Sequence, residues 1–274
     1  MILGYNTNGL AHHRLDDGLR LLADEGFGAV ALTPDVAHLD PYRSTAAEVE
    51  RIAALLARLD MTCVVEAGAR YLLDSQRKHW PTLLEDGAAD REVRVDFLRR
   101  CIRLAEQLGS DVVSFWAGRR PPGCDPAAAD ERLDRSISAL LAEAGERGVV
   151  LALEPEPGMY VETVAEGLEV LRRLGDGQEL TLTVDIGHLY VTGEGDPGEV
   201  LPRAAGRISQ VHVEDMCRGV HEHLPPGEGD VEFPAVWRAL EAAAYAGPVC
   251  FELSRSSHAA PEMLCLAKQI FHAR

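Results

Sequence analysis

Strand-like and helix-like segments alternate along the whole of the 274-residue chain. Short runs of β-branched and other apolar residues occur at residues 2–5, 29–33, 62–66, 111–116, 150–153, 179–184, 208–211 and 249–251. Amphipathic runs with helical spacing follow them at residues 15–25, 45–59, 90–108, 126–147, 163–174, 197–204, 234–246 and 261–273. Eight such strand–helix pairs favour a parallel (β/α)8 barrel. Because no Pro- or Ser-rich linker interrupts the pattern, we predict a single TIM-barrel domain with parallel strands over residues 1–274.

The charge of the chain limits what it can bind. Its 44 acidic residues outnumber its 27 lysines and arginines and give a net charge of −17, so nucleic acid would be repelled over most of the surface. No apolar run reaches the length of a membrane span, and residues 1–6 lack the features of a signal peptide. The six cysteines include no C-x-x-C pair, which indicates reduced thiols. We therefore expect a cytoplasmic protein that acts on a small molecule.

The last four predicted strands end on residues that can bind a metal ion. These residues are Glu154, Asp185, His212 and Glu252. A buried carboxylate is costly unless it is paired or bound to a metal, so packing does not explain acids at these positions. The carboxyl ends of the strands meet at one mouth of a TIM barrel, where active sites lie. Any one of the residues could be an ordinary polar residue at a barrel mouth, but their recurrence on successive strands favours a site.

The residue types at these strand ends indicate the chemistry. Two glutamates, an aspartate and a histidine suit one Mn²⁺, Mg²⁺ or Co²⁺ ion, and Zn²⁺ is possible. Such an ion could polarise the carbonyl of a polyhydroxy substrate and stabilise the enediolate that forms when a carbon-bound proton leaves. Glu154 and Glu252 could each bind the metal through one oxygen and exchange a proton through the other, as general base and acid.

Other polar residues near predicted strand ends allow more than one interpretation. Glu66 could line the site or be a salt-bridged structural acid. Trp116 could stack on a sugar or fill the barrel mouth. His188 could contact substrate, be a second ligand or begin a helix. Glu214 and Asp215 could hydrogen-bond to metal ligands or be solvated loop acids.

The long segment at residues 68–88 is unusually basic and aromatic for so acidic a protein. It contains Arg70, Arg77, Lys78 and Trp80. Long irregular segments inside compact domains are usually functional or mobile, so we expect a lid over the substrate.

Five local sequences resemble the xylose isomerase-like TIM-barrel superfamily, which includes sugar isomerases and epimerases, inosose dehydratase and endonuclease IV. They are Leu153-Glu154-Pro155, Val184-Asp185-Ile186-Gly187-His188, Val211-His212-Val213-Glu214-Asp215, Phe251-Glu252-Leu253 and residues 223–231, which are similar to the motif H-x-P-x-G-x-G-x-[IV]. The resemblance implies that Glu154, Asp185, His212 and Glu252 bind one metal ion and that the two glutamates move the proton. It also implies that His188 and Arg218 hold substrate hydroxyls and that the chain could form homo-oligomers.

The chain departs from the epimerase pattern at one position. Epimerases carry a further glutamate six residues after the first metal ligand, where this chain has Tyr160. Glu156 is closer to the strand, and we include it with His223, Glu66 and Trp116 among the expected substrate-binding residues.

Three functions remain open. The first is a metal-dependent isomerase or epimerase of a sugar or related polyhydroxy carbonyl compound. The second is an inosose-type dehydratase, in which His188 or His223 could protonate the leaving hydroxyl. The third is a barrel that binds metal and ligand without turnover. The resemblance argues against an endonuclease, because Trp116 stands where that enzyme needs a histidine.

Overall fold

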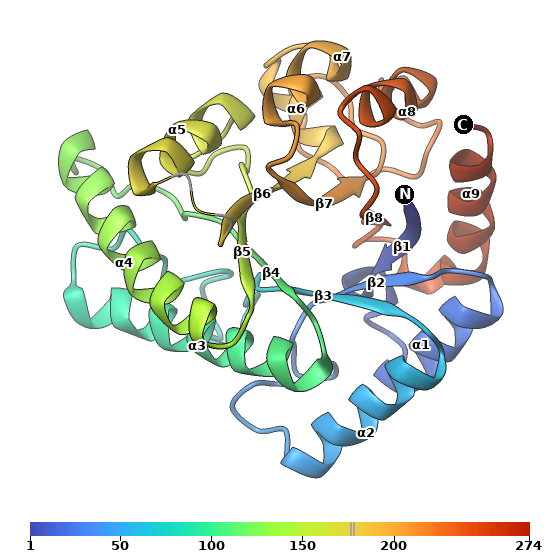
Figure 1. The fold of residues 1–274 in the computed structure, drawn as a ribbon, viewed down its shortest axis with the longest axis horizontal. Coiled ribbons are helices and arrows are strands. Elements are labelled where there is room, and N and C mark those ends of the chain that lie inside the picture. The colour runs from blue at the N-terminus through green and yellow to red at the C-terminus, as the bar shows by residue number, and fades with distance from the viewer. Residues whose placement is uncertain (176, 178) are drawn as a thin grey trace.

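The computed structural model describes residues 1–175, 177 and 179–274. Within these residues, eight parallel strands form a closed barrel in chain order (Figure 1). The strands are β1 (Ile2–Asn6), β2 (Ala29–Leu32), β3 (Thr62–Glu66), β4 (Val112–Phe115), β5 (Val150–Leu153), β6 (Leu180–Asp185), β7 (Ile208–Val213) and β8 (Pro248–Phe251). The predicted barrel is confirmed, and β7 continues past the predicted end, so that His212 lies within the strand rather than after it.

Helices surround the barrel (Figure 1). The α-helices are α1 (Leu15–Asp24), α2 (Ala46–Arg58), α3 (Ala88–Leu108), α4 (Pro126–Glu146), α5 (Val164–Leu174), α6 (Ile186–Thr192), α7 (Pro197–Val200), α8 (Phe233–Ala242) and α9 (Ala260–His272). Short 3₁₀ helices lie at Thr7–Leu10, Leu201–Ala204 and Ser257–Ala259. The predicted helix at residues 197–204 is therefore α7 followed by a 3₁₀ turn. None of the described helices is both long and apolar enough to cross a membrane.

Local hydrogen bonds fix where the helices begin. Thr45 precedes α2 and forms a capping box with Glu48: each side chain accepts a hydrogen bond from the other residue's backbone N–H, at 3.3 and 2.8 Å. Such a cap stabilises a helix by about 1 kcal/mol. Thr163 and Glu166 form the same motif at the start of α5.

Tight packing closes the barrel. A side chain at Gly4 would place its Cβ 2.5 Å from Cys250 Sγ, so β1 can lie beside β8 only with glycine there. Ser114 and Thr183 are fully buried, and their hydroxyls hydrogen-bond to each other at 2.8 Å. The six cysteines are free thiols.

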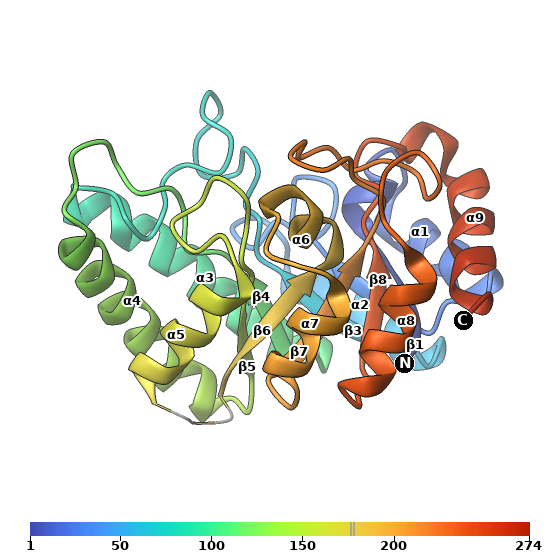
Figure 2. The ribbon, with the colours of Figure 1, turned by 90° about the horizontal axis from the view of Figure 1, so that it is seen from above.

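The loops that follow the strands gather at one end of the barrel, the upper side of Figure 2. The longest of these are the segment between β3 and α3, residues 67–87, and the segment between β7 and α8, residues 214–232. The fold thus brings the carboxyl ends of all strands and both long loops to the same mouth.

Candidate metal centre at the carboxyl end of the barrel

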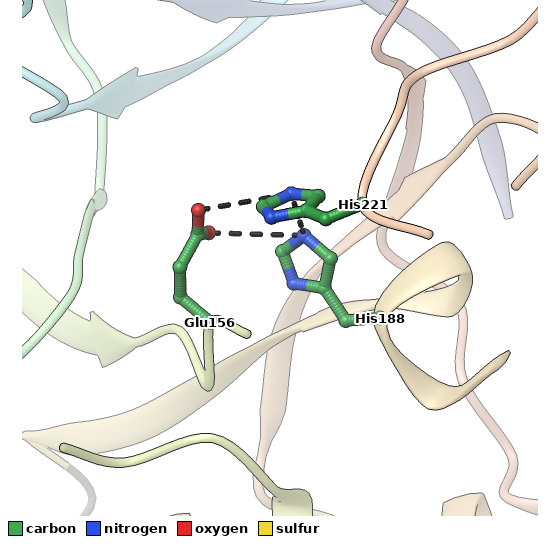
Figure 3. A group of neighbouring side chains, drawn as sticks. All are labelled: Glu156, His188 and His221. Carbon is green, nitrogen blue, oxygen red and sulfur yellow. Dashed lines mark hydrogen bonds and ion pairs between the residues drawn. The ribbon is translucent and has the colours of Figure 1, made fainter. Parts of the chain in front are cut away.

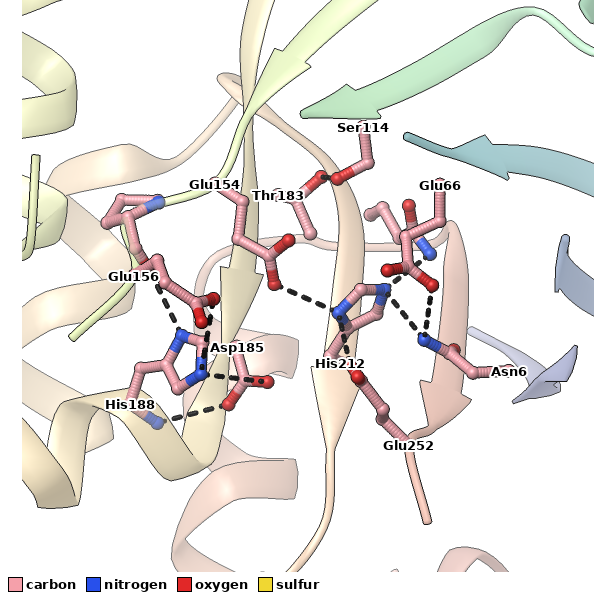
Figure 4. Close-up of polar contacts among 12 residues, drawn as sticks. Asn6, Glu66, Ser114, Glu154, Glu156, Thr183, Asp185, His188, His212 and Glu252 are labelled. Atoms are coloured by element: carbon pink, nitrogen blue, oxygen red, sulfur yellow. Dashed lines mark hydrogen bonds and ion pairs between the residues drawn. The ribbon is translucent and has the colours of Figure 1, made fainter. Parts of the chain in front are cut away.

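The four predicted metal ligands come together at this mouth (Figure 4). Asp185 is the last residue of β6 and pairs in register with His212 of β7, whereas Glu154 and Glu252 directly follow β5 and β8. One ligand atom from each of the four residues lies within 4.8 Å of the others. The side chains are therefore close enough to share one ion.

The ring of His212 is oriented by its neighbours. Its Nδ1 lies 3.0 Å from Glu154 Oε1 and 3.1 Å from Glu252 Oε2, so Nδ1 is the nitrogen that would bind a metal. Its Nε2 lies 2.7 Å from the side-chain amide of the fully buried Gln210. Gln210 Oε1 has no partner among the described residues. With its amide turned by half a rotation, Gln210 would accept a hydrogen bond from His212 Nε2–H and leave Nδ1 free for a metal.

The burial of these acids supports a cation. Glu154 and Asp185 are 4% and 2% exposed, and Asp185 Oδ2 has no hydrogen-bond partner among the described residues. Carboxylates packed together away from water are costly without a compensating positive charge. Three carboxylates and an imidazole also form a donor set that suits Mn²⁺, Co²⁺ or Mg²⁺. The residues present therefore fit a divalent ion.

In the metal-free protein, protons supply part of this positive charge. Burial alone would lower the pKa of His212, but the Glu154 and Glu252 carboxylates raise this pKa well above its usual value. Burial would raise the pKa of Glu252, but His223 and His212 hold it well below its usual range. Metal binding at Nδ1 would have to displace the proton of His212.

A cavity of about 480 Å³ opens above these ligands. Its lining includes both glutamates of the centre, Glu154 and Glu252, and residues from several loops. Predicted substrate-binding residues that also line it are Glu66, Trp116, Glu156, His188 and His223. Asn8 and His221, which the sequence did not single out, line it too, and Asn8 Nδ2 donates a hydrogen bond of 2.8 Å to Glu252 Oε1.

Glu66 is held in the cavity by neutral groups. The Thr33 hydroxyl and the Asn6 amide donate hydrogen bonds to Glu66 Oε2 at 2.5 and 3.3 Å. Burial, with the Glu252 carboxylate nearby, raises the pKa of Glu66 to about 8. This environment is that of a site-lining acid rather than of a salt-bridged one.

His188 lines the cavity from the first turn of α6, as in the alternative that it begins a helix. Asp185 caps this helix, because its Oδ1 accepts a hydrogen bond of 3.0 Å from the backbone N–H of His188. The ring Nδ1 lies 3.0 Å from Pro155 O, which leaves Nε2 facing the site. Asp185 thus ends the strand, begins the helix and orients the histidine that follows.

His188 Nε2 meets two further polar groups (Figure 3). It lies 3.2 Å from His221 Nε2 and 3.7 Å from Glu156 Oε2. Burial opposes protonation of His188, but the Asp185 and Glu156 carboxylates raise its pKa to about 9. Burial and the positive charge on His188 lower the pKa of His221 to about 4. The cluster therefore offers both hydrogen-bond donors and acceptors to a polyhydroxy ligand.

The 67–87 loop forms one rim of the cavity, and a buried arginine holds it in place. Gly68, Arg70, Lys78 and His79 of this loop line the cavity. Arg94 of α3 is 2% exposed and donates hydrogen bonds to Pro81 O at 2.8 Å and His79 O at 2.6 Å. Its guanidinium carbon lies 4.5 Å from the centre of the Trp116 ring. The sequence did not identify Arg94, because a charged residue in an amphipathic helix is expected to be exposed.

Two residues lie away from this cavity. Arg218 is exposed, lies 5.0 Å from the Tyr190 ring centre and is not among the residues lining the cavity. Its position gives no support to the predicted substrate contact. Tyr160 donates a hydrogen bond to Asp130 at 3.0 Å, so its hydroxyl does not take the place of the epimerase glutamate.

Solved structures share this fold. A D-tagatose 3-epimerase-like protein superposes with a TM-score of 0.81 at 23% sequence identity, covering 100% of this chain and 99% of that chain. The IOLI protein, solved with a zinc atom bound, gives a TM-score of 0.80 at 19% identity and covers 99% and 96% of the two chains. At these identities the likeness shows the fold alone.

The sequence is also similar to enzymes with named activities. L-Ribulose-5-phosphate 3-epimerase UlaE of Shigella flexneri serotype 5b (strain 8401) is 27% identical over 243 residues, which are 86% of this chain and 80% of the relative. Inosose dehydratase of Lacticaseibacillus casei is 28% identical over 139 residues, which are 44% of this chain and 46% of the relative. The family profile described as xylose isomerase-like TIM barrel matches residues 19–269. This chain therefore belongs to the xylose isomerase-like TIM barrel family.

Proposed function

We propose that this protein is a divalent-metal-dependent epimerase or isomerase of a sugar or related polyhydroxy carbonyl compound, acting through an enediolate. The observation that carries the proposal is the convergence of Glu154, Asp185, His212 and Glu252 within 4.8 Å at the floor of a polar cavity. The similarity to an L-ribulose-5-phosphate 3-epimerase over most of the chain supports the same reaction type.

These four residues would hold the ion, which would act as a Lewis acid that polarises a substrate carbonyl and stabilises the negative charge of the enediolate. The proton transfers fall to Glu154 and Glu252, which follow β5 and β8. One carboxylate takes the proton from the carbon beside the carbonyl, and the other returns a proton to that carbon on the opposite face for epimerisation. Asn8 orients the Glu252 carboxylate for this exchange.

Other side chains of the cavity would bind the substrate. His188, Glu156 and Glu66 offer polar groups to its hydroxyls, and Trp116 offers an aromatic surface to its C–H groups. His223 lines the cavity at the beginning of the H-x-P-x-G-x-G-x-[IV] segment. A cavity of about 480 Å³ is large enough for a monosaccharide, which is within the usual range for small-molecule sites.

Solvent-deuterium exchange tests the proposal. The Mn²⁺-loaded protein is incubated in D₂O with a panel of ketoses and inososes, and deuterium at carbon is measured by mass spectrometry and NMR. We expect exchange with at least one ketose, and its loss in Glu252→Gln. Glu50→Gln, on the exposed face of α2, is the matched control and should exchange like wild type. Metal-loaded protein that exchanges no carbon-bound proton would contradict the proposal and favour a binding protein without turnover.

The second candidate function is an inosose-type dehydratase, which the similarity to the L. casei enzyme favours. This reaction begins with the same proton abstraction but then expels a β-hydroxyl. His188 and His223 line the cavity and could protonate the leaving group. Product analysis in the same incubations separates the functions, because epimerisation conserves mass and dehydration removes one water.

A further inference from the structure

A second group of metal-ligand side chains lies beside the first. Asp185, Glu214, His223 and Glu252 each offer one ligand atom, and these atoms lie within 4.8 Å of one another. Asp185 and Glu252 belong to both groups, whereas the proposed reaction leaves Glu214 without a role.

Buried polar atoms without hydrogen-bond partners are concentrated in this second group. Among the described residues, Glu214 Oε1, Glu214 Oε2, Asp185 Oδ2 and His223 Nδ1 all lack a partner. Glu214 is 0% exposed. Its Oε2 lies 3.7 Å from His223 Nδ1, which is too long for a hydrogen bond. Buried groups left in this way call for an explanation, and an ion bound between them is one.

The surrounding backbone positions the Glu214 side chain beside the other members of the second group. The residue directly follows β7, and its carboxylate packs against the first turn of α6. A Cβ at Gly187 would collide with Glu214 Oε1, so the glycine is needed for this packing. Asp215 fixes the loop that carries His223, because its oxygens accept hydrogen bonds from Gly227 N and Val231 N at 2.7 and 2.9 Å. Glu214 and His223 are thus both held by rigid surroundings.

The second group of acids adjoins the first centre. The first centre already gathers three carboxylates, from Glu154, Asp185 and Glu252, around one site. On the adjoining side, His188 Nε2 lies 3.6 Å from Asp185 Oδ2, and the fully buried Glu214 faces His223 at 3.7 Å. A second divalent ion between Glu214 and His223 would supply a partner to Glu214, Asp185 and His223, which carry these buried atoms.

We propose that Asp185, Glu214, His223 and Glu252 form a second divalent-cation site, which shares the Asp185 and Glu252 side chains with the first. Three carboxylates and one imidazole suit Mn²⁺, Co²⁺ or Zn²⁺. The second site does not depend on the reaction proposed above.

Metal stoichiometry tests the second site. Full-length protein is stripped with a chelator, dialysed against excess Co²⁺ or Mn²⁺, freed of unbound ion and measured for metal per chain. We expect two ions in wild type and one in Glu214→Gln, which keeps the shape of the side chain and removes its charge. His223→Ala should also bind one. Glu222→Gln, which removes a neighbouring acid that pairs with Arg255, is the matched control and should bind two. The Mn²⁺ EPR spectrum should change from a spin-coupled pair to an isolated ion in Glu214→Gln.

The outcomes separate this inference from the proposed function. One ion in wild type and Glu214→Gln alike, lost in His212→Ala, would overturn the second site and leave the first intact. One ion in wild type that is lost in Glu214→Gln but kept in His212→Ala would uphold the second site and remove the basis of the proposed reaction. Two ions in both wild type and Glu214→Gln, with a circular dichroism spectrum like that of wild type, would also overturn the second site.

Discussion

The floor and the rim of the cavity are built in different ways. The floor consists of Glu154, Asp185, His212 and Glu252, which are fixed by the register of β5 to β8 and are largely buried. The rim is the irregular 67–87 loop, whose position depends on hydrogen bonds from Arg94 to its carbonyl groups. We infer that the floor supplies the reaction and that the rim adds to substrate binding through the residues of the 67–87 loop that line the cavity. Changes in the floor should therefore abolish turnover, and changes in the rim should weaken binding.

The largest effect is expected for Glu154→Gln in the floor. Loss of one proton-transferring carboxylate should lower kcat for deuterium exchange by about 10²–10⁴-fold. The amide keeps the shape of the side chain, so the circular dichroism spectrum should not change. Glu50→Gln on α2 is the control. A Glu154→Gln enzyme with more than half of wild-type kcat would show that the floor does not carry the reaction.

A smaller effect is expected when the support of the floor is changed. Gln210 lies 2.7 Å from His212 Nε2 and is fully buried, so Gln210→Leu would leave that nitrogen with only the longer contact of 3.5 Å to the Asn6 amide. Loss of such a supporting hydrogen bond typically weakens metal binding by about 10–100-fold. Competition with a fluorescent chelator would measure the affinity, and Gln107→Leu on the exposed face of α3 serves as control. Equal affinities of wild type and Gln210→Leu would mean that the metal does not use Nδ1 of His212.

The floor and the rim also differ in how well the sequence predicts them. The floor follows from topology, because strands of a parallel barrel end at one mouth and each ligand is tied to a strand end. The helix α6 escaped prediction because it has only seven residues and contains β-prone ones such as Ile186, Tyr190 and Val191. The same segment shows that a carboxylate at the end of a strand can also cap the next helix, as Asp185 does.

Loop-borne residues could not be placed from sequence spacing. Arg218 lies six residues after His212, but the loop turns it toward Tyr190, while His223 reaches the cavity. Arg94 donates hydrogen bonds to carbonyl groups up to 27 residues earlier in the chain, and the helical sequence pattern does not predict such partners. Glu214 lies two residues after His212 in the chain. Only the structure reveals that Glu214 is fully buried without a hydrogen-bond partner among the described residues.

A moderate effect on binding is expected for Arg94→Lys in the rim support. Lysine keeps the charge but cannot reach Pro81 O and His79 O together, so the 67–87 loop should loosen. We expect KM to rise by about tenfold, roughly 1.4 kcal/mol, with little change in kcat. Chymotrypsin should also cleave the loop faster after Tyr71. Arg99→Lys, on the same helix and ion-paired with Glu92, is the control. A fall in kcat at unchanged KM would contradict the assignment of binding to the rim.

The smallest effect is a pH dependence of stability that arises in the rim. His79 lies edge-on to Trp116, with ring centres 5.2 Å apart, and burial lowers its pKa to about 4. In the unfolded chain a histidine titrates near 6.5. Between these values the unfolded chain binds a proton that the folded rim excludes, so folding stability falls as the pH drops through this window and gains nothing above it.

His79→Gln removes this titration, so the urea midpoint of wild type should fall more steeply than that of the variant between about pH 6.5 and 4. Other buried histidines titrate in both proteins, so the difference between the two slopes isolates His79. His12→Gln, at an exposed position, should retain the wild-type slope. Parallel slopes for wild type and His79→Gln would mean that the 67–87 loop opens and hydrates this ring before the protein unfolds. The rim would then be a freely opening loop beside a fixed floor, and not an anchored one.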